Sequence, residues 1–368
     1  MVHQVPGKPS LLLNLKQDKK KLEKHAKELS IHLLEDWKQL QEDDIEVAEI
    51  SGGITNLLWK LSPKQQHKLA PVVFRAFGEQ TDRLIERGRE HEVVLQLNKA
   101  GFGAQVLASF DNGRIEAFLD LRTLEPKDMT VNPMAARIAR RLKQFHQASI
   151  DGDRTPQTFA IIKKWIEMAK DLDFSGDPKK QAAYVKLDLE AMHKECCETE
   201  AACLRLDSPV VFTHCDMLSG NVLVPRHEDS DAVGTSPDSM QFIDFEYARW
   251  GYRGFDLGNH FNEYAGFECD YSRYPGKDHI ADFMRNYLEE GFDRQPSKAE
   301  VDKAVVECNA YALASHQFWG IWALHQASFS PIDFDYIGYV DLRWNEYHRR
   351  KQEFLADVDA WFRQHSTS

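Results

Sequence analysis

The chain is 368 residues long, with 42% hydrophobic residues and a formal net charge of −12 at pH 7. This length and apolar content suffice for a large core and for two lobes. The acidic balance, without an extended Lys/Arg stripe, argues against nucleic acid as a partner. The six cysteines form no C-x-x-C pair, and no secretory signal sequence is recognisable, so we expect a reduced, cytoplasmic protein with free thiols.

The first 121 residues alternate between short apolar runs and polar turns. Residues 1–45 predict a polar helical extension, and its basic run from Lys16 to Lys27 fits a solvated helix face better than a membrane or partner surface. Residues 46–121 predict five strands with one helix after the third, which is typical of the small lobe of a kinase-like fold. We expect these elements at 46–61 (two strands around a Ser-Gly-Gly turn), 72–77, 81–100 (the helix, ended by Gly101), 105–110 and 114–119.

Beyond residue 121 the pattern becomes mostly helical, with a few short strands and a polar insertion at 226–239. We expect helices at 132–147, 158–171, 179–204 and from 255 to the end, and strands at 209–212, 222–224 and 240–243. The apolar run Ala312–Ala327 contains two His and two Gln, which favours a buried core helix over a membrane span. The fold class is therefore α+β, a protein-kinase-like, two-lobed fold with a small antiparallel-sheet N-lobe (46–121) and a large, mostly helical C-lobe (122–368).

The most informative stretch has the spacing H-x-D-x-x-x-x-N, formed by His214, Asp216 and Asn221, and is followed by Ile243-Asp244-Phe245. Phosphoryl transfer needs an in-line acceptor, a positioned triphosphate and metal charge on the developing anion. Asp216 can accept a proton from an attacking hydroxyl, and Asn221 and Asp244 can hold Mg²⁺ on the phosphates of ATP. The first motif alone can arise by chance, but the second motif and the strand-like flanks make coincidence a weak explanation. His214 suits bracing its loop better than acting as a base, because Asp216 already fills that role.

Two features of the N-lobe suit a nucleotide. The turn Ser51-Gly52-Gly53-Ile54-Thr55-Asn56 can bring backbone N–H groups to phosphate oxygens, with Ser51 and Asn56 as further donors; an ordinary β-turn is the alternative. It is not a Walker A loop, because no Gly-Lys-Ser/Thr follows. Arg75 on the third strand and Glu90 on the next helix can pair to hold a cation at the phosphates, or can be ordinary surface residues. Other charged residues on that helix leave the identity of the pairing carboxylate open.

The segment after the second motif places Asp256 at the start of a predicted helix, with His260 one turn later. An aspartate at this position commonly caps its own helix. It can instead accept the backbone N–H groups of the catalytic loop, and the two uses can coexist. His260 fits a structural hydrogen bond better than a catalytic role.

Four aromatic residues recur near the C-terminal end, namely Trp319 and Trp322 three apart on one helix face, and Tyr336 and Tyr339. Aromatic stripes at helical spacing are most often core. A ring of indoles and phenols with a carboxylate is also how proteins bind ammonium groups. The residues that can complete such a cage are Glu246, Tyr247 and Glu263.

With these motifs the chain resembles the choline/ethanolamine kinases from Ser51 to about Tyr347. The segments that carry the resemblance are 51–56, 211–216, 243–247, 253–263 and 313–322. The last two are specific to this family, whereas the H-x-D loop is shared with aminoglycoside phosphotransferases and protein kinases. The short connection 262–275 and the segments 332–339 and 122–126 are similar to the ethanolamine branch, especially to its plant-like members. Thr213 and Cys215 depart from the residues more usual in the family.

The resemblance implies an enzyme that phosphorylates the hydroxyl of ethanolamine with ATP and Mg²⁺, the first step towards phosphatidylethanolamine. A choline or dual-specificity kinase is the alternative, and a pseudokinase that only binds partners, or an aminoglycoside kinase, fits less well. Residue by residue it implies Asp216 as the base, Asn221 and Asp244 as metal ligands, Arg75 with Glu90 at the phosphates, Leu119 near the adenine, and Tyr247, Glu263, Trp319, Trp322 and Tyr339 around the amine. Family members are often homodimers, which adds a homodimer to the expectations.

Overall fold

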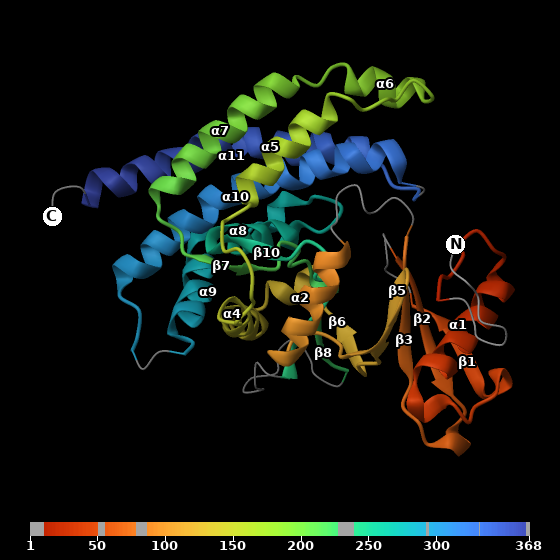
Figure 1. The fold of residues 1–368 in the computed structure, drawn as a ribbon. Helices are drawn as coiled ribbons and strands as arrows, with labels where there is room; N and C mark the ends of the chain where they lie inside the picture. The colour runs from red at the N-terminus through yellow and green to blue at the C-terminus, as the bar shows by residue number, and fades with distance from the viewer. Residues whose placement is uncertain are drawn as a thin grey trace. The chain divides into compact units, whose positions relative to one another are not determined.

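The computed structural model describes residues 11–50, 56–78, 87–226, 239–291, 294–330 and 332–365. The chain divides into two compact units, Met1–Leu121 and Arg122–Ser368. Figure 1 shows a sheet as the main feature of the first unit and helices as the main feature of the second.

The first unit is built on one five-stranded antiparallel sheet with the strand order β1-β2-β3-β5-β4. Its elements are α1 (Lys19–Leu33), β1 (Ile45–Glu49), β2 (Asn56–Pro63), β3 (Val72–Phe77), α2 (Arg87–Lys99), β4 (Val106–Phe110) and β5 (Gly113–Ala117). The predicted order of five strands with a helix after the third is therefore found. The last strand was predicted to reach residue 119 but ends at Ala117. Gly101 follows α2 with φ +83°, the left-handed conformation that glycine adopts most readily.

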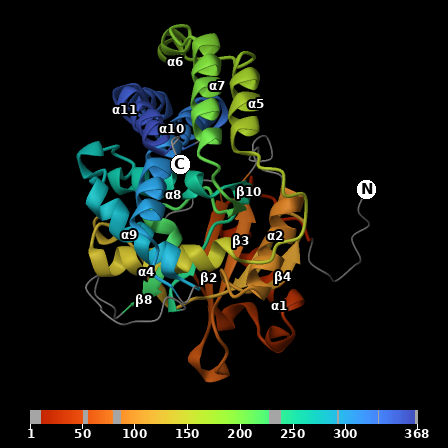
Figure 2. The same ribbon diagram turned by 90° about the vertical axis from the view of Figure 1, so that its left-hand side faces the viewer.

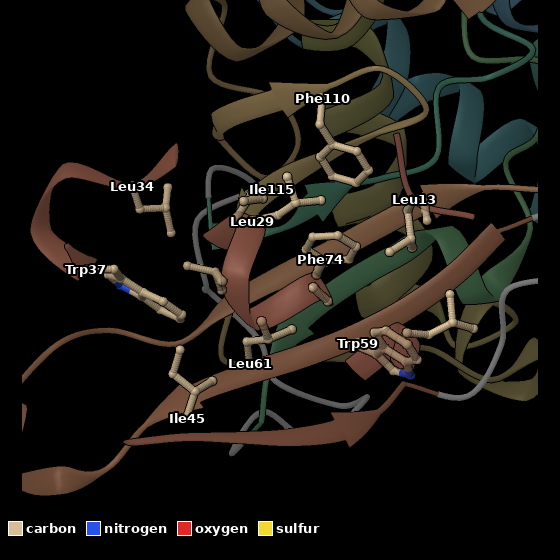
Figure 3. Packing of buried hydrophobic residues seen from close by; sticks show 14 of the residues in the cluster. Leu13, Leu29, Leu34, Trp37, Ile45, Trp59, Leu61, Phe74, Phe110 and Ile115 are labelled. Atoms are coloured by element: carbon tan, nitrogen blue, oxygen red, sulfur yellow. The ribbon is translucent and has the colours of Figure 1, made fainter. Parts of the chain in front are cut away.

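Helix α1 packs its apolar stripe, Leu22, Ala26 and Leu29, into the core of this sheet. Figure 3 shows that the same core holds side chains from before α1, from the segment after it and from the strands. The members labelled there are Leu13, Leu29, Leu34, Trp37, Ile45, Trp59, Leu61, Phe74, Phe110 and Ile115. The lysines of α1 lie on its other face, where Lys19 pairs with Glu49 at 2.8 Å. The basic run is thus a solvated face over a buried stripe.

The second unit is mostly helical. Its elements are β6 (Leu121–Thr123), α3 (Pro126–Met129), α4 (Asn132–His146), α5 (Thr158–Ala169), α6 (Pro178–Tyr184), α7 (Leu189–Arg205), β7 (Val210–Thr213), β8 (Val222–Pro225), β9 (Gln241–Phe242), β10 (Arg249–Tyr252), α8 (Arg253–Asn262), α9 (Lys277–Glu289), α10 (Lys298–Phe329) and α11 (Tyr336–His365). Two small sheets, β6-β8-β9 and β10-β7, lie among these helices.

Helix α10 is the centre of the second unit, and it packs against α5, α7, α8, α9 and α11 (Figures 1 and 2). Every residue from Ala312 to Ala327 is buried, as the sequence predicted for a core helix. Of the helices that the described residues form, none has both the length and the apolar character needed to cross a bilayer.

Helix α8 approaches α10 closely because residue 258 is glycine. A Cβ atom at Gly258 would lie 2.5 Å from the backbone nitrogen of Ala312 and 2.6 Å from the carbonyl oxygen of Cys308. No larger residue fits there without moving a helix backbone. The contact fixes the orientation of α8, which carries Asp256 and Asn259 into the site described below.

Three local predictions for the second unit were wrong. The single helix expected at 179–204 is two helices, α6 and α7, because the Asp188 side chain accepts the Ala191 N–H at 2.9 Å and starts a new helix there. The strands β6 and β10 were missed, since each is short and its partner lies far away in the sequence. Helix α8 begins at Arg253 and not at residue 255.

Candidate active site

The catalytic loop connects β7 to β8 and brings Asp216 against Asn221. The Asn221 amide donates both to the Asp216 side-chain oxygen Oδ2 and to the Asp216 carbonyl oxygen, each at 2.9 Å. A 3-10 turn, Ser219–Asn221, closes the loop and makes this contact possible. The spacing of five residues therefore places a carboxylate and an amide side by side, and both are largely buried.

Asp256 holds the backbone of this loop from helix α8. Its two carboxylate oxygens accept the N–H groups of His214 and Cys215, each at 2.6 Å. It also accepts a hydrogen bond from Nε2 of His146 on α4 at 2.9 Å, and Tyr287 on α9 donates to the other nitrogen of that ring at 2.7 Å. Asp256 is fully buried in the first turn of α8, whose N-cap is Tyr252. The use as an N-cap, one of the two alternatives left open by the sequence, is therefore not found.

Cys215 carries the loop through an uncommon backbone conformation. Its φ is +69°, in the left-handed region that costs a non-glycine residue about 1–2 kcal/mol. Its N–H donates to Asp256, and its carbonyl oxygen accepts from Asn259 Nδ2 at 3.1 Å. These bonds hold the strained conformation directly before Asp216.

The strain at Cys215 predicts how replacement by Gly and by Ala changes the free energy of unfolding. At the buried Cys308, inside α10, we expect replacement by Gly to cost about 1 kcal/mol more than replacement by Ala. At Cys215 that extra cost is expected to vanish or reverse, because Gly also removes about 1–2 kcal/mol of left-handed strain. Urea unfolding of the four variants measures both differences. Equal Gly-minus-Ala differences at the two positions would contradict backbone strain at Cys215.

Two buried histidines brace the loop as neutral rings. His214 Nε2 donates to the Ile243 carbonyl oxygen at 3.0 Å, and His260 Nδ1 donates to the Met217 carbonyl oxygen at 3.1 Å. Burial lowers the pKa of both imidazoles, and that of His260 falls to about 4. Both rings therefore act as hydrogen-bonding groups that join the loop to neighbouring segments.

Asn221 and Asp244 offer oxygen ligands next to each other. The Ile243 N–H donates to the Asn221 carbonyl oxygen at 3.1 Å, and Asp244 follows directly with a left-handed φ of +66°. One carboxylate and one amide oxygen suit Mg²⁺, which takes few protein ligands and completes its shell with phosphate and water. In the part of the chain that the structure describes, no three His, Cys, Asp or Glu side chains form a metal-binding group.

Three other carboxylates lie near Asp216 and affect its pKa. Burial raises the pKa of Asp216 well above its ordinary value, and the charges of Glu263, Asp244 and Glu246 raise it further. The hydrogen bond from Asn221 acts in the opposite direction. A site with this charge favours cations, and each cation that binds there lowers the pKa of Asp216 again.

Aromatic side chains from α10 pack around Tyr247, which is buried near this acidic group, so that burial and the charges of Glu246, Asp216 and Asp244 raise the pKa of its phenol. Trp319 packs edge-to-face against Tyr247 and Trp322, with ring centroids 5.2 Å apart in each pair. Trp322 Nε1 donates to the Tyr247 hydroxyl at 2.7 Å, and Trp319 Nε1 donates to Asn259 Oδ1 at 2.8 Å. The indole N–H groups are thus satisfied within the protein, and an aromatic ring attracts an organic cation through its negative face.

Glu263 and Tyr339, two other residues expected around the amine, meet at Arg343 of α11. Arg343 Nη1 donates to Glu263 Oε1 and to the Tyr339 hydroxyl, each at 3.1 Å. Sequence reasoning missed both Arg343 and Asn259. Arg343 lies one helical turn after Tyr339, and Asn259 three residues after Asp256, so helical spacing from a candidate residue was the signal that could have found them.

In the first unit, Arg75 belongs to a buried cluster of four charges. Arg75 lies 3.7 Å from Glu116, and Glu90 accepts a hydrogen bond from Arg114 at 2.8 Å. Arg114 is the register partner of Arg75 across β3 and β5, and Arg114 Nε also donates to Glu116. Two carboxylates therefore hold two guanidinium groups, whereas the sequence predicted a single pair of Arg75 and Glu90. The charges of the two arginines lower the pKa of Glu116 despite its burial.

The remaining nucleotide candidates are only partly described. Ser51, Gly52 and Gly53 lie outside the described residues. Asn56 opens β2, and Leu119 follows β5 two residues after its end.

Comparison with known proteins identifies the family of this site. The family model for choline/ethanolamine kinase matches residues 47–348. The chain belongs to the choline/ethanolamine kinase family. A probable ethanolamine kinase from Arabidopsis thaliana is 44% identical over 325 residues, which cover 88% of this chain and 84% of that protein. The resemblance stated from the sequence, including its plant-like character, is thus confirmed.

Solved structures agree with this assignment. A Plasmodium vivax ethanolamine kinase matches with a TM-score of 0.77 at 29% identity, over 91% of each chain. A choline kinase from Cryptosporidium parvum matches with a TM-score of 0.76 at 23% identity, over 94% of this chain and 99% of that chain, a likeness that shows the fold. The predicted protein-kinase-like α+β fold and the prediction of a kinase are confirmed.

Proposed function

We propose that this enzyme transfers the γ-phosphoryl group of ATP to the hydroxyl of ethanolamine, giving phosphoethanolamine and ADP. The observation that carries the proposal is the position of Tyr247, which lies near the carboxylates around Asp216 and also contacts the rings of Trp319 and Trp322. A hydroxyl at one end of the substrate and an ammonium at the other match these two surfaces. The names of the ethanolamine kinase relatives support the same substrate.

Asp216 is the proposed base. It accepts the hydroxyl proton as the substrate oxygen bonds to the γ-phosphorus and the bond from that phosphorus to the ADP oxygen breaks. The Asn221 amide donates to one Asp216 oxygen at 2.9 Å, and Asp256 holds the backbone N–H groups of His214 and Cys215. The loop therefore presents the carboxylate in one orientation, which is the main contribution that a protein makes to phosphoryl transfer.

Asn221 and Asp244 are the proposed ligands of Mg²⁺. When bound, the metal ion supplies positive charge to the phosphate oxygens as negative charge develops on them. The residues proposed for the nucleotide are Ser51, Gly52, Gly53, Asn56, Arg75, Glu90 and Leu119. Within this set Arg75 supplies a permanent cation for phosphate, and its buried carboxylate neighbours fix its position.

Glu263, Glu246 and the aromatic residues Tyr247, Trp319, Trp322 and Tyr339 are proposed to receive the ammonium. A primary ammonium has three N–H donors and needs acceptors such as Glu263. Choline has none and depends on aromatic faces, so a choline or dual-specificity kinase is the second candidate. A pseudokinase is disfavoured because Asp216, Asn221 and Asp244 are all present. A cytoplasmic location and a homodimer complete the proposal, and light scattering of the purified protein tests the dimer.

One experiment tests the substrate. We expect kcat/KM to fall along the series ethanolamine, monomethylethanolamine, dimethylethanolamine and choline, by about tenfold or more in total. The physical reason is that each methyl group removes an N–H donor that an acidic acceptor would otherwise bind. Steady-state ADP release with each substrate measures the series. A rise in kcat/KM with methylation would overturn ethanolamine in favour of choline.

A further inference from the structure

Arg343 is a fully buried cation next to the proposed amine pocket. Its side chain, on α11, is 2% exposed. It donates to Glu263 and Tyr339 at 3.1 Å, to the Ser315 carbonyl oxygen at 3.2 Å and to the Ser315 hydroxyl at 2.8 Å. A buried charge is tolerated only when it is paired and hydrogen-bonded, and here three different partners hold one guanidinium group.

The carboxylate of Glu263 is shared between Arg343 and whatever binds in the pocket. Arg343 occupies Oε1, and within the described ranges no group donates to Oε2. Burial raises the pKa of the Glu263 carboxyl, and the charge and hydrogen bond of Arg343 oppose that rise. Glu263 lies near enough to Asp216 for its charge to raise the pKa of that residue. The second oxygen of the Glu263 carboxyl group therefore has no protein donor within the described ranges and lies near the proposed base.

A second set of hydrogen bonds runs from Arg343 to the catalytic loop. The Ser315 hydroxyl, which accepts from Arg343, donates to Asn259 Oδ1 at 2.7 Å. The other end of the Asn259 amide donates to the Cys215 carbonyl oxygen, and Trp319 donates to the same Oδ1. One residue on α11 is thus linked to the acidic acceptor, to an indole wall and to the peptide group before Asp216.

We propose that Arg343 is a positioning residue that holds the Glu263 side chain in one orientation, and that it thereby makes the pocket select a primary ammonium over a quaternary one. The inference rests on the proposed function, because it concerns the amine end of that substrate. A primary ammonium can donate to the remaining Glu263 oxygen, whereas a quaternary ammonium has no donor for it. Loss of the correct Glu263 orientation should therefore lower kcat/KM for ethanolamine more than kcat/KM for choline.

The test is the substitution Arg343→Lys, which keeps the charge but cannot span Glu263, Tyr339 and Ser315 at once. We expect kcat/KM for ethanolamine to fall about tenfold or more, mainly through KM, and kcat/KM for choline to change by less than about threefold. KM for ATP should stay unchanged. A smaller change, Ser315→Ala, removes one anchor of Arg343 and should lower the ethanolamine-to-choline ratio by about threefold.

Arg350→Lys is the matched control, because Arg350 lies on the same helix and pairs with Glu346 and Glu353, each at 3.2 Å. It should leave the ratio unchanged. Equal losses for both substrates in Arg343→Lys would overturn the inference, as would an unchanged ratio in Ser315→Ala if Arg343→Lys does not fold. Wild-type activity with ethanolamine is measured before any variant is made. If the wild-type enzyme does not phosphorylate ethanolamine, the proposed function itself is overturned.

Discussion

Replacement of Asp216 by Asn is expected to lower kcat by about three orders of magnitude, because general-base catalysis typically contributes a factor of about 10²–10⁴. Asn keeps the shape of the side chain and can still contact Asn221, but it cannot accept a proton. ATP should bind at least as tightly as before, since a negative charge near the phosphates is removed. Single-turnover kinetics and calorimetric titration of ATP separate the two effects.

The same substitution is expected to raise the melting temperature. Burial and three neighbouring carboxylates raise the pKa of Asp216 in the folded protein. A carboxyl with a raised pKa is destabilising at neutral pH, where the unfolded chain holds it ionised. This cost begins to fall as the pH drops below the folded-state pKa, and it is gone below the unfolded-state pKa of about 3.9. Asn carries no charge to desolvate, so the variant should gain stability as it loses activity.

Asp302→Asn serves as the control for both measurements, because Asp302 is a partly exposed residue of α10 that pairs with Lys298. Neither kcat nor the melting temperature should change measurably there, since exposed ion pairs contribute little. Near-normal turnover of Asp216→Asn would sink the assignment of the base. A lower melting temperature would instead show that the loop needs the negative charge to fold.

The parts of the molecule that could be predicted are those fixed by local spacing. Asp216 and Asn221 lie in one short loop, so their contact follows from five residues of chain. The apolar pattern of the sequence predicted the strand at 72–77 and the core helix around Ala312–Ala327. Helix α7 was less clear, because its start depends on one side chain, Asp188, inside a pattern that reads as continuous helix.

The parts that could not be predicted depend on contacts between distant segments. Arg343 contacts Glu263 across 80 residues, and His146 contacts Asp256 across 110 residues. Glu263 and Asp256 were candidates from the sequence, but their partners Arg343 and His146 were not, and the packing of α4, α8 and α11 brings these partners to them. Arg114 and Glu116 were closer to prediction, because they lie on one face of β5 and Arg114 lies opposite Arg75.

The role of Asp256 gives the second large prediction, because the two uses considered from the sequence imply opposite results for Asp256→Asn. An N-cap tolerates Asn as well as Asp. The observed carboxylate instead accepts three donors, from the backbones of His214 and Cys215 and from the ring of His146. An amide must turn its NH₂ group towards at least one of them. We expect the free energy of unfolding to fall by about 3 kcal/mol, because at least one buried N–H donor then has no acceptor.

The matched control is Asp177→Asn, because Asp177 also accepts two backbone N–H groups at a helix start, from Lys179 and Lys180 at 2.9 and 3.1 Å. Asp177 does cap its helix, α6, so Asn should change the free energy of unfolding there by less than about 0.5 kcal/mol. Urea unfolding of the two variants gives the comparison. Equal, small losses at both positions would mean that Asp256 contributes no more than an ordinary cap. A large loss at Asp256 alone, with a fall in kcat and an unchanged KM for ATP, would show that one carboxylate both stabilises the second unit and holds the catalytic loop in shape.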